Sequence, residues 1–222
     1  MNVIELLECE STNEELKKKI GSVEPGTLLW SQHQTKGKGQ RSRTWVSVPG
    51  DFTGSIYFRL EASPYITQVS IRIGVEICLF LRKFIPNVFL KWPNDLMIKR
   101  EDSLFKWGGI LCESIQKNNI IHLVVGFGLN QIKKNESFEM PSISSEELGI
   151  KSVDCISLLQ NVYQSFNTSD FSFRDHFEKV HLFQVGEEIT VGTQKGVYLG
   201  LSSYGELILD QNGVRKKIQK NI

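Results

Sequence analysis

The sequence predicts an α+β protein with a large mixed domain followed by a small all-β domain. Apolar residues recur at helical spacing near residues 69–85 and 155–166, between segments that are rich in strand-forming residues. After residue 182 the texture changes to short strand-like pieces broken by glycines, which favours a small barrel.

Composition narrows the class of protein. The 222 residues are 40% hydrophobic and 23% charged, which is typical of a globular protein, and a net charge of +1 argues against a broad nucleic-acid or membrane surface. The four cysteines are scattered without a C-x-x-C pair, so we expect reduced thiols. Acidic residues interrupt the N-terminus and no segment approaches the ~20 apolar residues of a membrane span, so we expect a cytoplasmic protein.

The N-terminal elements follow from local signals. Residues 2–8 form the first predicted strand, and Ser11 with Glu14 fits a capping box for a helix that continues to residue 20 and ends at Gly21. Predicted strands at 26–34 and 54–60 are joined by a long connection, and such connections are usually functional or mobile.

The remaining elements follow in order along the chain. Pro86 stops the helix of residues 69–85, and a turn at 117–119 makes the last two of the next four strands an antiparallel hairpin. Residues 135–150 read as a surface loop, and we place the domain boundary near residue 182. The strands after Pro86 are expected at 88–92, 95–99, 106–116 and 119–130, the later helices at 155–166 and 173–181, and the C-terminal strands at 187–191, 195–201, 205–210 and 214–218.

The connection contains KGKGQRSRT, residues 36–44, with four cations and two glycines. Glycines let the backbone approach a ligand, and the flanking cations would neutralise a phosphate or carboxylate. A solvated turn is the alternative, because the spacing is not that of a phosphate-binding P-loop. Trp45 adds an aromatic face on which a ring could stack, although such a tryptophan is more often packed in a core or at its rim.

Three further motifs are weak when taken singly. Lys91-Trp-Pro-Asn-Asp95 could hold Mg²⁺ and orient phosphates, or could serve only as a turn. Lys106 stands before Gly108 and Gly109, whose missing side chains admit a ligand, yet a surface lysine is the default explanation. Gly126-Phe-Gly-Leu-Asn130 lacks the third glycine of a dinucleotide fingerprint.

Taken together, the blocks S-T-N, Q-T-x-G-x-G-Q-x-x-x-x-W, K-W-P-N-D, K-x-G-G-I-L and G-x-G-x-N are far more specific. In this order and spacing the chain resembles the biotin protein ligases over essentially its whole length, with K-W-P-N-D as the sharpest block. The resemblance implies a catalytic domain related to class II aminoacyl-tRNA synthetases at residues 1–182 and an SH3-like domain at residues 183–222.

The resemblance also implies the reaction. Such enzymes join biotin to ATP with Mg²⁺, giving biotinyl-5′-AMP, and then transfer biotin to one lysine of a biotin carboxyl carrier protein, usually that of acetyl-CoA carboxylase. No nucleophilic side chain is needed, because the biotin carboxylate and then the acceptor lysine attack.

Site residues carry over motif by motif. Lys106 is expected to meet the biotin carboxylate and the α-phosphate as the main catalytic residue, with Lys38 as the second. Asp95 is the expected metal ligand. The implied biotin site is Ser11, Thr12, Asn13, Gln34, Lys38, Gly39, Gln40, Lys106 and Gly109, and the implied ATP site is Arg41, Arg43, Trp45, Asn94, Asp95 and Asn130.

The glycine-rich loop departs from the family pattern G-R-G-R-x-G-R. Lysine at 38 keeps the charge without the bidentate fork, glutamine at 40 loses the charge, and Ser42 restricts the backbone. We hypothesise that Gln40 holds biotinyl-AMP less tightly than arginine would, so a Gln40→Arg variant should release it more slowly.

Other interpretations remain open at this point. Lipoate ligases share the fold and the acyl-adenylate chemistry, and a non-enzymatic biotin- or nucleotide-binding module would follow if the loop departures abolish catalysis. A DNA-binding repressor is disfavoured, because S-T-N begins at residue 11 and the near-neutral charge offers no DNA face. A homodimer is compatible with the family, although no interface strip is visible in the sequence.

Overall fold

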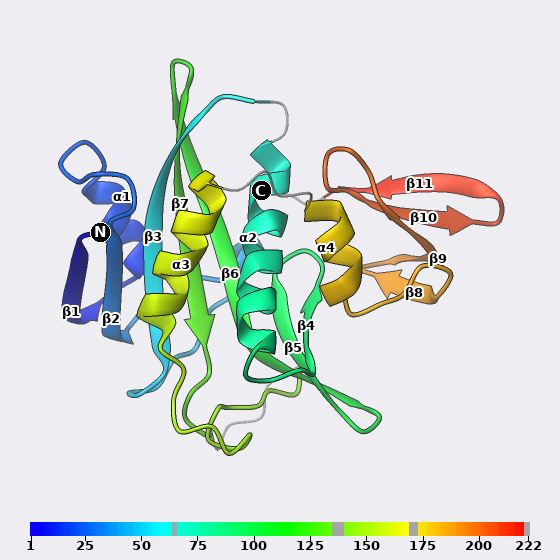
Figure 1. Ribbon diagram of the computed structural model, residues 1–222, viewed down its shortest axis with the longest axis horizontal. Helices are drawn as coiled ribbons and strands as arrows, with labels where there is room; N and C mark the ends of the chain where they lie inside the picture. Colours follow the sequence, from blue (N-terminus) through cyan, green and yellow to red (C-terminus); the bar gives the residue numbers. More distant parts are fainter. Residues whose placement is uncertain (64–65, 135–139, 169–172, 220–222) are drawn as a thin grey trace.

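The computed structural model describes residues 1–63, 66–134, 140–168 and 173–219. A seven-stranded sheet in the order β1-β2-β3-β7-β6-β5-β4 forms the centre of the molecule (Figure 1). Only β1 and β2 run parallel, and the other neighbours are antiparallel. The strands are β1 (Val3–Cys9), β2 (Leu28–Gln34), β3 (Phe52–Glu61), β4 (Val88–Lys91), β5 (Asp95–Arg100), β6 (Ser103–Lys117) and β7 (Ile120–Leu129).

Helices cover both faces of this sheet. The short α1 (Thr12–Lys18) packs on one face, where Leu16 meets Leu29, Tyr57 and Val124 in a small apolar cluster. On the other face α2 (Ile66–Arg82) and α3 (Cys155–Thr168) lie side by side, and α4 (Phe173–Val180) packs against α2 on the side of the C-terminal strands (Figure 1).

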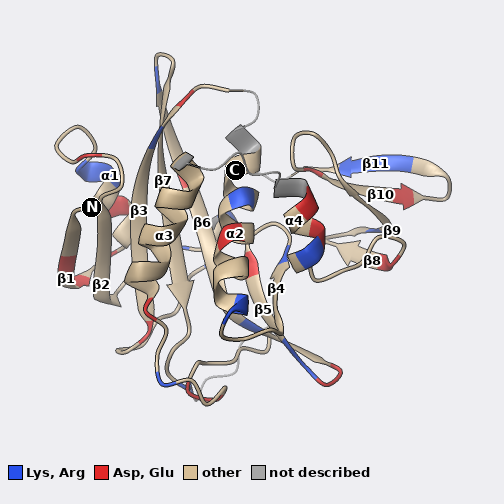
Figure 2. Ribbon diagram, viewed as in Figure 1, with Lys and Arg blue, Asp and Glu red and all other residues tan. Residues whose placement is uncertain are grey.

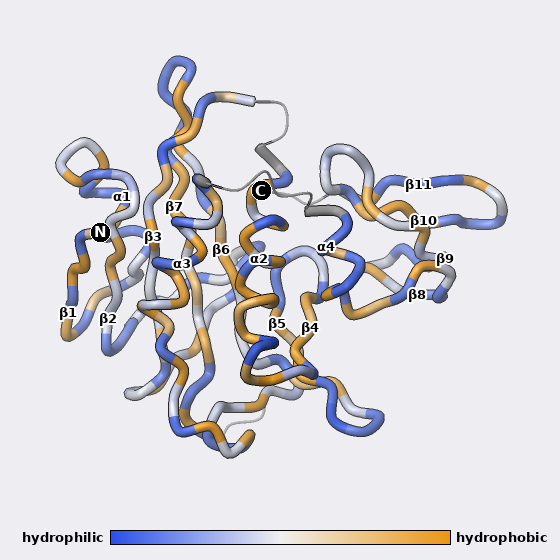
Figure 3. The backbone as a smooth tube through the Cα atoms, viewed as in Figure 1, coloured by the Kyte–Doolittle hydropathy of each residue, from blue (hydrophilic) through white to orange (hydrophobic). Residues whose placement is uncertain are grey.

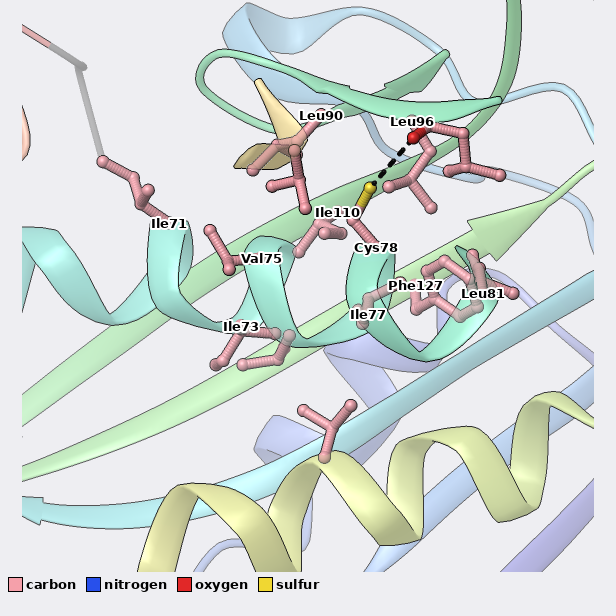
Figure 4. Packing of buried hydrophobic residues seen from close by; sticks show 14 of the residues in the cluster. Ile71, Ile73, Val75, Ile77, Cys78, Leu81, Leu90, Leu96, Ile110 and Phe127 are labelled. Carbon is pink, nitrogen blue, oxygen red and sulfur yellow. Dashed lines mark hydrogen bonds between the residues drawn. The ribbon is translucent and has the colours of Figure 1, made fainter. Parts of the chain in front are cut away.

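The main core lies between α2, α3 and the sheet. Ile73, Ile77 and Leu81 recur along α2 and are fully buried, and the close-up in Figure 4 shows this helix packed over Ile110 and Phe127 of the sheet. Hydropathy follows the same division, because the apolar stretches of the tube in Figure 3 run through α2 and the central strands. Helical spacing of apolar residues therefore predicted the helix and most of its packed face, but α2 ends at Arg82 and Phe84, inside the predicted helix, is 68% exposed.

The opposite sheet face is lined differently, since side chains alternate along a strand. In β7, Val125, Phe127 and Leu129 belong to the main core, whereas Gly126 and Gly128 fall on the face that carries α1. Because these two glycines have no side chains, the side chains of Asn13 and Trp45 can approach the sheet closely near the start of α1.

The C-terminal strands form a separate antiparallel sheet in the order β11-β10-β9-β8. Its members are β8 (Glu188–Val191), β9 (Gln194–Leu201), β10 (Leu207–Gln211) and β11 (Val214–Ile218). Within the described residues its end strands β8 and β11 are not paired with each other. The boundary near residue 182 stays a prediction.

Most predicted elements are present, with local differences. The β6–β7 hairpin turns at Asn118, which adopts a φ of 54°. Ser11 occupies the N-cap position of α1, but its side chain makes no capping hydrogen bond, so the capping-box prediction is wrong on this point. The predicted loop at 135–150 lies partly outside the described residues.

Two other expectations can be compared with the structure. All four cysteines are free, and three of them are buried. Among the described residues, no helix combines the length and the apolar character needed to cross a membrane.

Candidate functional site

A cavity of about 290 Å³ opens between the α1 face of the sheet, the glycine-rich loop and the C-terminal domain. Fourteen of the fifteen residues that the sequence predicted for the site line it, so blocks far apart in the chain converge on one space. The lining includes Ser11, Thr12, Asn13, Gln34, Lys38, Gly39, Gln40, Arg41, Arg43, Trp45, Asn94, Asp95, Lys106 and Gly109.

One wall of the cavity is a network of neutral polar groups. Gln34 Oε1 accepts hydrogen bonds from the Thr12 backbone N (2.7 Å) and from Thr12 Oγ1 (3.0 Å). Ser55 Oγ, fully buried, lies 2.8 Å from Thr12 Oγ1 and 2.6 Å from Asn13 Oδ1. Thr12, Asn13 and Gln34 line the cavity, and the buried Ser55 supports them from inside the protein; we call these four residues the polar wall. It offers fixed amide and hydroxyl groups to a neutral ligand that has both donors and acceptors.

Gly126 explains why the polar wall can form. A β-carbon at this position would lie 2.5 Å from Asn13 Oδ1, so any larger residue would displace the amide. Asn13 Nδ2 also donates to the carboxylate of Glu113 over 2.7 Å, which fixes the orientation of its amide. The G-x-G block therefore acts by making room for the S-T-N block.

The glycine-rich loop is a small hairpin. Lys38 pairs with Thr44, Gly39 N donates to Arg43 O over 2.7 Å, and the tip is a short 3₁₀ turn at Gln40–Ser42. Arg41 at this tip adopts a φ of 56°, the left-handed region that favours glycine. The loop thus reaches over the cavity with exposed cations while its backbone is partly hydrogen-bonded to itself.

The Trp45 ring packs against two glycines of the sheet at the end of this hairpin. A β-carbon on Gly128 would come within 2.5 Å of its ring, and one on Gly109 would stand 3.4 Å away. The ammonium groups of Lys106 and Lys134 lie 5.6 and 5.9 Å from its ring, within cation–π range. Gly109 and Gly128, from two of the sequence motifs, therefore leave the space that the indole occupies.

A β-bulge directs Lys106 into the cavity. Lys106 and Gly109 are an odd number of residues apart and would face opposite sides of a regular strand, but the β5–β6 register shifts between Leu96 and Met97. As a result Lys106 lies beside Gly109, and its Nζ contacts Asp95 Oδ1 at 2.6 Å. The predicted catalytic cation and the predicted metal ligand thus form an ion pair.

The two asparagines predicted for the ATP site have structural partners. Asn94 lines the cavity, and its Nδ2 donates to Ile110 O over 2.8 Å, which ties the K-W-P-N-D turn to β6. Asn130 does not line this cavity: its Nδ2 donates to Lys106 O over 3.3 Å and its Oδ1 accepts from Lys134 Nζ over 2.8 Å. Asn130 therefore fixes the backbone of Lys106 from outside the cavity.

Sequence reasoning missed a further wall of the cavity, which begins just after α4 and continues into the C-terminal sheet. His181, Phe183, Val191 and Leu207 also line the cavity, and Trp92 Nε1 donates to Gly205 O over 3.0 Å. Burial lowers the pKa of His181 to about 4, against a weaker opposite effect of the Phe183 carbonyl, which accepts from its ring. No local motif announces these residues, because they meet the cavity only through domain packing.

The positive charge of the cavity does not come from the most basic strand of the C-terminal sheet. Figure 2 shows β11 in blue, and Arg215, Lys216 and Lys217 on this strand are exposed and absent from the lining. The cations that line the cavity are Lys38, Arg41 and Arg43 of the glycine-rich loop together with Lys91 and Lys106.

Comparisons with known proteins point to one family. The biotin/lipoate A/B protein ligase family matches residues 4–130. The bifunctional ligase/repressor BirA of Salmonella typhimurium is 29% identical, over 97% of this chain and 71% of its own length. The solved biotin protein ligase of Aquifex aeolicus, in complex with biotin and ATP, is 28% identical with a TM-score of 0.74, and the alignment covers 98% of this chain and 95% of that one.

Proposed function

Because this chain belongs to the biotin/lipoate A/B protein ligase family, we propose that it activates biotin with ATP and transfers it to a lysine of a carrier protein. The observation that supports this most directly is the position of Lys106. Its ammonium lies in one cavity with the polar wall on one side and the cationic loop on the other. A neutral ring and an anionic nucleotide would therefore meet at this lysine.

The first half-reaction requires two anions to approach each other. The biotin carboxylate attacks the α-phosphorus of ATP, a biotinyl-AMP anhydride forms, and the bond to pyrophosphate breaks. Lys106 would offset the repulsion between carboxylate and phosphate and stabilise the charge of the transition state. Asp95, at 2.6 Å, holds the ammonium in place and must share it when the substrates enter.

Mg²⁺ fits this site through one protein carboxylate. Asp95 faces the cavity, and Mg²⁺ in ATP sites is typically held by one or two carboxylates together with substrate phosphates and water. The metal would neutralise the charge of the phosphates when bound. We found no cluster of three acidic, histidine or cysteine ligands in the described part of the chain, in keeping with a metal held mainly by the nucleotide.

In the second half-reaction the acceptor lysine of the carrier attacks the acyl carbon, an amide forms and AMP leaves. We propose the biotin carboxyl carrier protein of acetyl-CoA carboxylase as this acceptor, in the cytoplasm. A relative from Mycobacterium tuberculosis carries the name biotin--[acetyl-CoA-carboxylase] ligase and is 23% identical over 91% of this chain.

The test is incubation of the protein with biotin, Mg²⁺-ATP and a purified carrier domain, followed by mass spectrometry of the carrier. We expect one biotinyl increment on one lysine. Lys106→Met should lower the rate by roughly 100-fold or more, as for loss of a charge-stabilising group. Lys117→Met, at the exposed far end of the same strand, is the matched control and should leave the rate unchanged.

Two outcomes would contradict the proposal. A lipoyl increment from lipoate, with none from biotin, would assign the protein to the lipoate branch of the family. Binding of biotin and ATP without release of pyrophosphate would indicate a non-enzymatic binding module.

A further inference from the structure

The glycine-rich loop is tied to helix α1 by an ion pair. Lys38 Nζ lies 2.5 Å from Glu14 Oε1, and the same oxygen accepts from Lys17 Nζ at 2.8 Å. Lys17 also contacts Glu113 at 3.0 Å. Two cations and two anions thus alternate between the loop, the helix and the sheet.

This cluster continues into the polar wall. The second oxygen of Glu113 accepts from Asn13 Nδ2 at 2.7 Å, and Asn13 Oδ1 lies 2.6 Å from Ser55 Oγ. A continuous series of ion pairs and hydrogen bonds therefore connects Lys38 to the polar wall. Glu14 is the member that joins the loop to this fixed network.

Glu14 is charged at neutral pH. Hydrogen bonds from Lys17 and from Lys38 lower the pKa of Glu14. Partial burial alone would lower the pKa of Lys17, but its bonds to Glu14 and Glu113 outweigh that effect and raise it. The Lys38 side chain is about half exposed and also lines the cavity, so it can reach either Glu14 or a bound anion.

We propose that Glu14 is a positioning residue that holds Lys38 in the ligand-free protein and competes with the bound anion for it. The consequence for the adenylate rests on the proposed function, but the contact in the ligand-free protein does not. When a phosphate enters, Lys38 exchanges its carboxylate partner for the ligand. The affinity for the anionic ligand is reduced by the cost of breaking this pair.

The first experiment is hydrogen exchange of the loop amides in the ligand-free protein. Glu14→Gln keeps the shape and removes the charge, so exchange at residues 36–40 should rise about two- to five-fold, the range for an exposed ion pair. Glu15→Gln is the matched control, because Glu15 forms an equivalent i,i+3 pair with Lys18 at 2.7 Å on the same helix without touching the loop.

A double-mutant cycle separates this contact from general loosening of α1. In a Lys38→Met background, Glu14→Gln should cause no further rise in loop exchange, whereas Glu15→Gln should behave as in the native background. High salt should raise loop exchange more in the native protein than in Glu14→Gln, in which the exposed Lys36–Glu10 pair remains to be screened. Equal exchange in Glu14→Gln and Glu15→Gln would overturn the proposal.

The second experiment measures release of biotinyl-AMP. Removing the competing carboxylate should slow dissociation about two- to five-fold in Glu14→Gln, with an unchanged melting temperature. Unchanged or faster release would show that Glu14 does not compete for Lys38. If the native protein binds no adenylate, the proposed function fails, while the exchange experiment still decides whether Glu14 holds the loop.

Discussion

The two sides of the cavity are built in contrasting ways. Thr12, Asn13 and Ser55 in the polar wall are at most 3% exposed and are hydrogen-bonded to one another. On the loop side, Lys38 is half exposed and pairs across the surface. Buried polar groups fix geometry because an unmade bond is costly, whereas exposed ion pairs contribute little and exchange partners easily.

The contrast suits a ligand with a neutral ring at one end and a mobile charge at the other. A preset wall can select the ring by its pattern of donors and acceptors. Exposed cations can follow a phosphate whose position changes during the reaction. We therefore expect substitutions of buried polar residues, in the polar wall or in the β2–β3 connection, to lower stability. Substitutions in the glycine-rich loop should mainly change the rate of ligand release.

The largest effect is expected at Asp51, which anchors the end of the β2–β3 connection from inside the protein. Its side chain is fully buried, pairs with Lys134 at 2.8 Å and accepts backbone hydrogen bonds from Val48, Gln131 and Ile132. Asp51→Ala removes the buried carboxylate that pairs with the Lys134 ammonium and accepts three backbone hydrogen bonds, which should cost about 3–5 kcal/mol. Calorimetry should show a melting temperature lower by roughly 10 °C.

The matched control lies at the start of the loop. Glu10 pairs with Lys36 at 2.6 Å, but both side chains are more than half exposed. Glu10→Ala should leave the melting temperature unchanged. If both variants lose the same stability, the distinction between buried and exposed anchors is wrong.

The second-largest effect is expected in acid, where the low pKa of His181 should reduce the stability of the folded protein. The pKa of His181 is about 4, below its ordinary 6.5, so the unfolded chain binds a proton that the folded protein excludes. Stability is therefore complete above pH 6.5 and is lost as the pH falls toward 4, by about 3 kcal/mol from this group. Unfolding in urea at a series of pH values measures the slope.

A His181→Phe variant isolates that contribution. The Tyr198 ring packs at a tilt against His181, with the ring centroids 5.0 Å apart, and burial raises the pKa of Tyr198, so Tyr198 stays neutral throughout this range. Glu178 bonds to Tyr198, and because burial raises its pKa it acts in the opposite direction. The variant should flatten the acid slope between pH 4 and 6.5, and an unchanged slope would exclude His181 as its source.

A substitution at Gly128 tests the packing of Trp45, which follows the glycine-rich loop and lies against the sheet. A β-carbon there would lie 2.5 Å from the Trp45 ring, so Gly128→Ala should displace the indole at a cost of about 1–3 kcal/mol and weaken ATP binding. Gly109→Ala is the graded comparison, since its β-carbon would stand 3.4 Å from the same ring. Urea unfolding should rank Gly128→Ala as clearly more destabilising, and equal losses would mean that the indole is not seated as described.

The sequence predicted the elements and the convergence of motifs because both depend on local patterns. Helical spacing identified α2, and the order of the five blocks indicated which residues share the cavity. It could not predict the bulge that turns Lys106 toward Gly109, since the strand register depends on the neighbouring strand. Asn130 was expected at the phosphates, but the partners of its amide depend on long-range packing.

The long-range contacts of Glu14 and His181 could not be predicted from the sequence either. Glu14 read as part of a capping box. Its i,i+3 spacing from Lys17 is a local signal for an ion pair, but nothing local indicates that its carboxylate also meets Lys38. The same holds for His181, whose role in the cavity depends on the docking of the C-terminal sheet. Contacts between separate elements require coordinates, whereas periodicity and motif order do not.

The smallest expected effect concerns the tip of the loop. Arg41 has a φ of 56°, which costs an ordinary residue about 1 kcal/mol and costs glycine nothing in steric terms. Arg41→Gly and Arg41→Ala both remove the cation, but only alanine keeps the β-carbon that opposes this backbone. Glycine should therefore be more favourable than alanine by at most about 1 kcal/mol, because its greater freedom in the unfolded chain offsets part of the gain.

Hydrogen exchange at residues 39–43 is the appropriate measurement, since global unfolding hardly senses an exposed tip. Slower exchange in Arg41→Gly than in Arg41→Ala would show that the left-handed turn is present in solution and that its strain limits the order of the loop. Biotinyl-AMP release should rise equally in both variants if the guanidinium alone contacts the ligand. Slower release from the glycine variant would instead mean that the backbone of the tip, as well as its charge, helps to retain the adenylate.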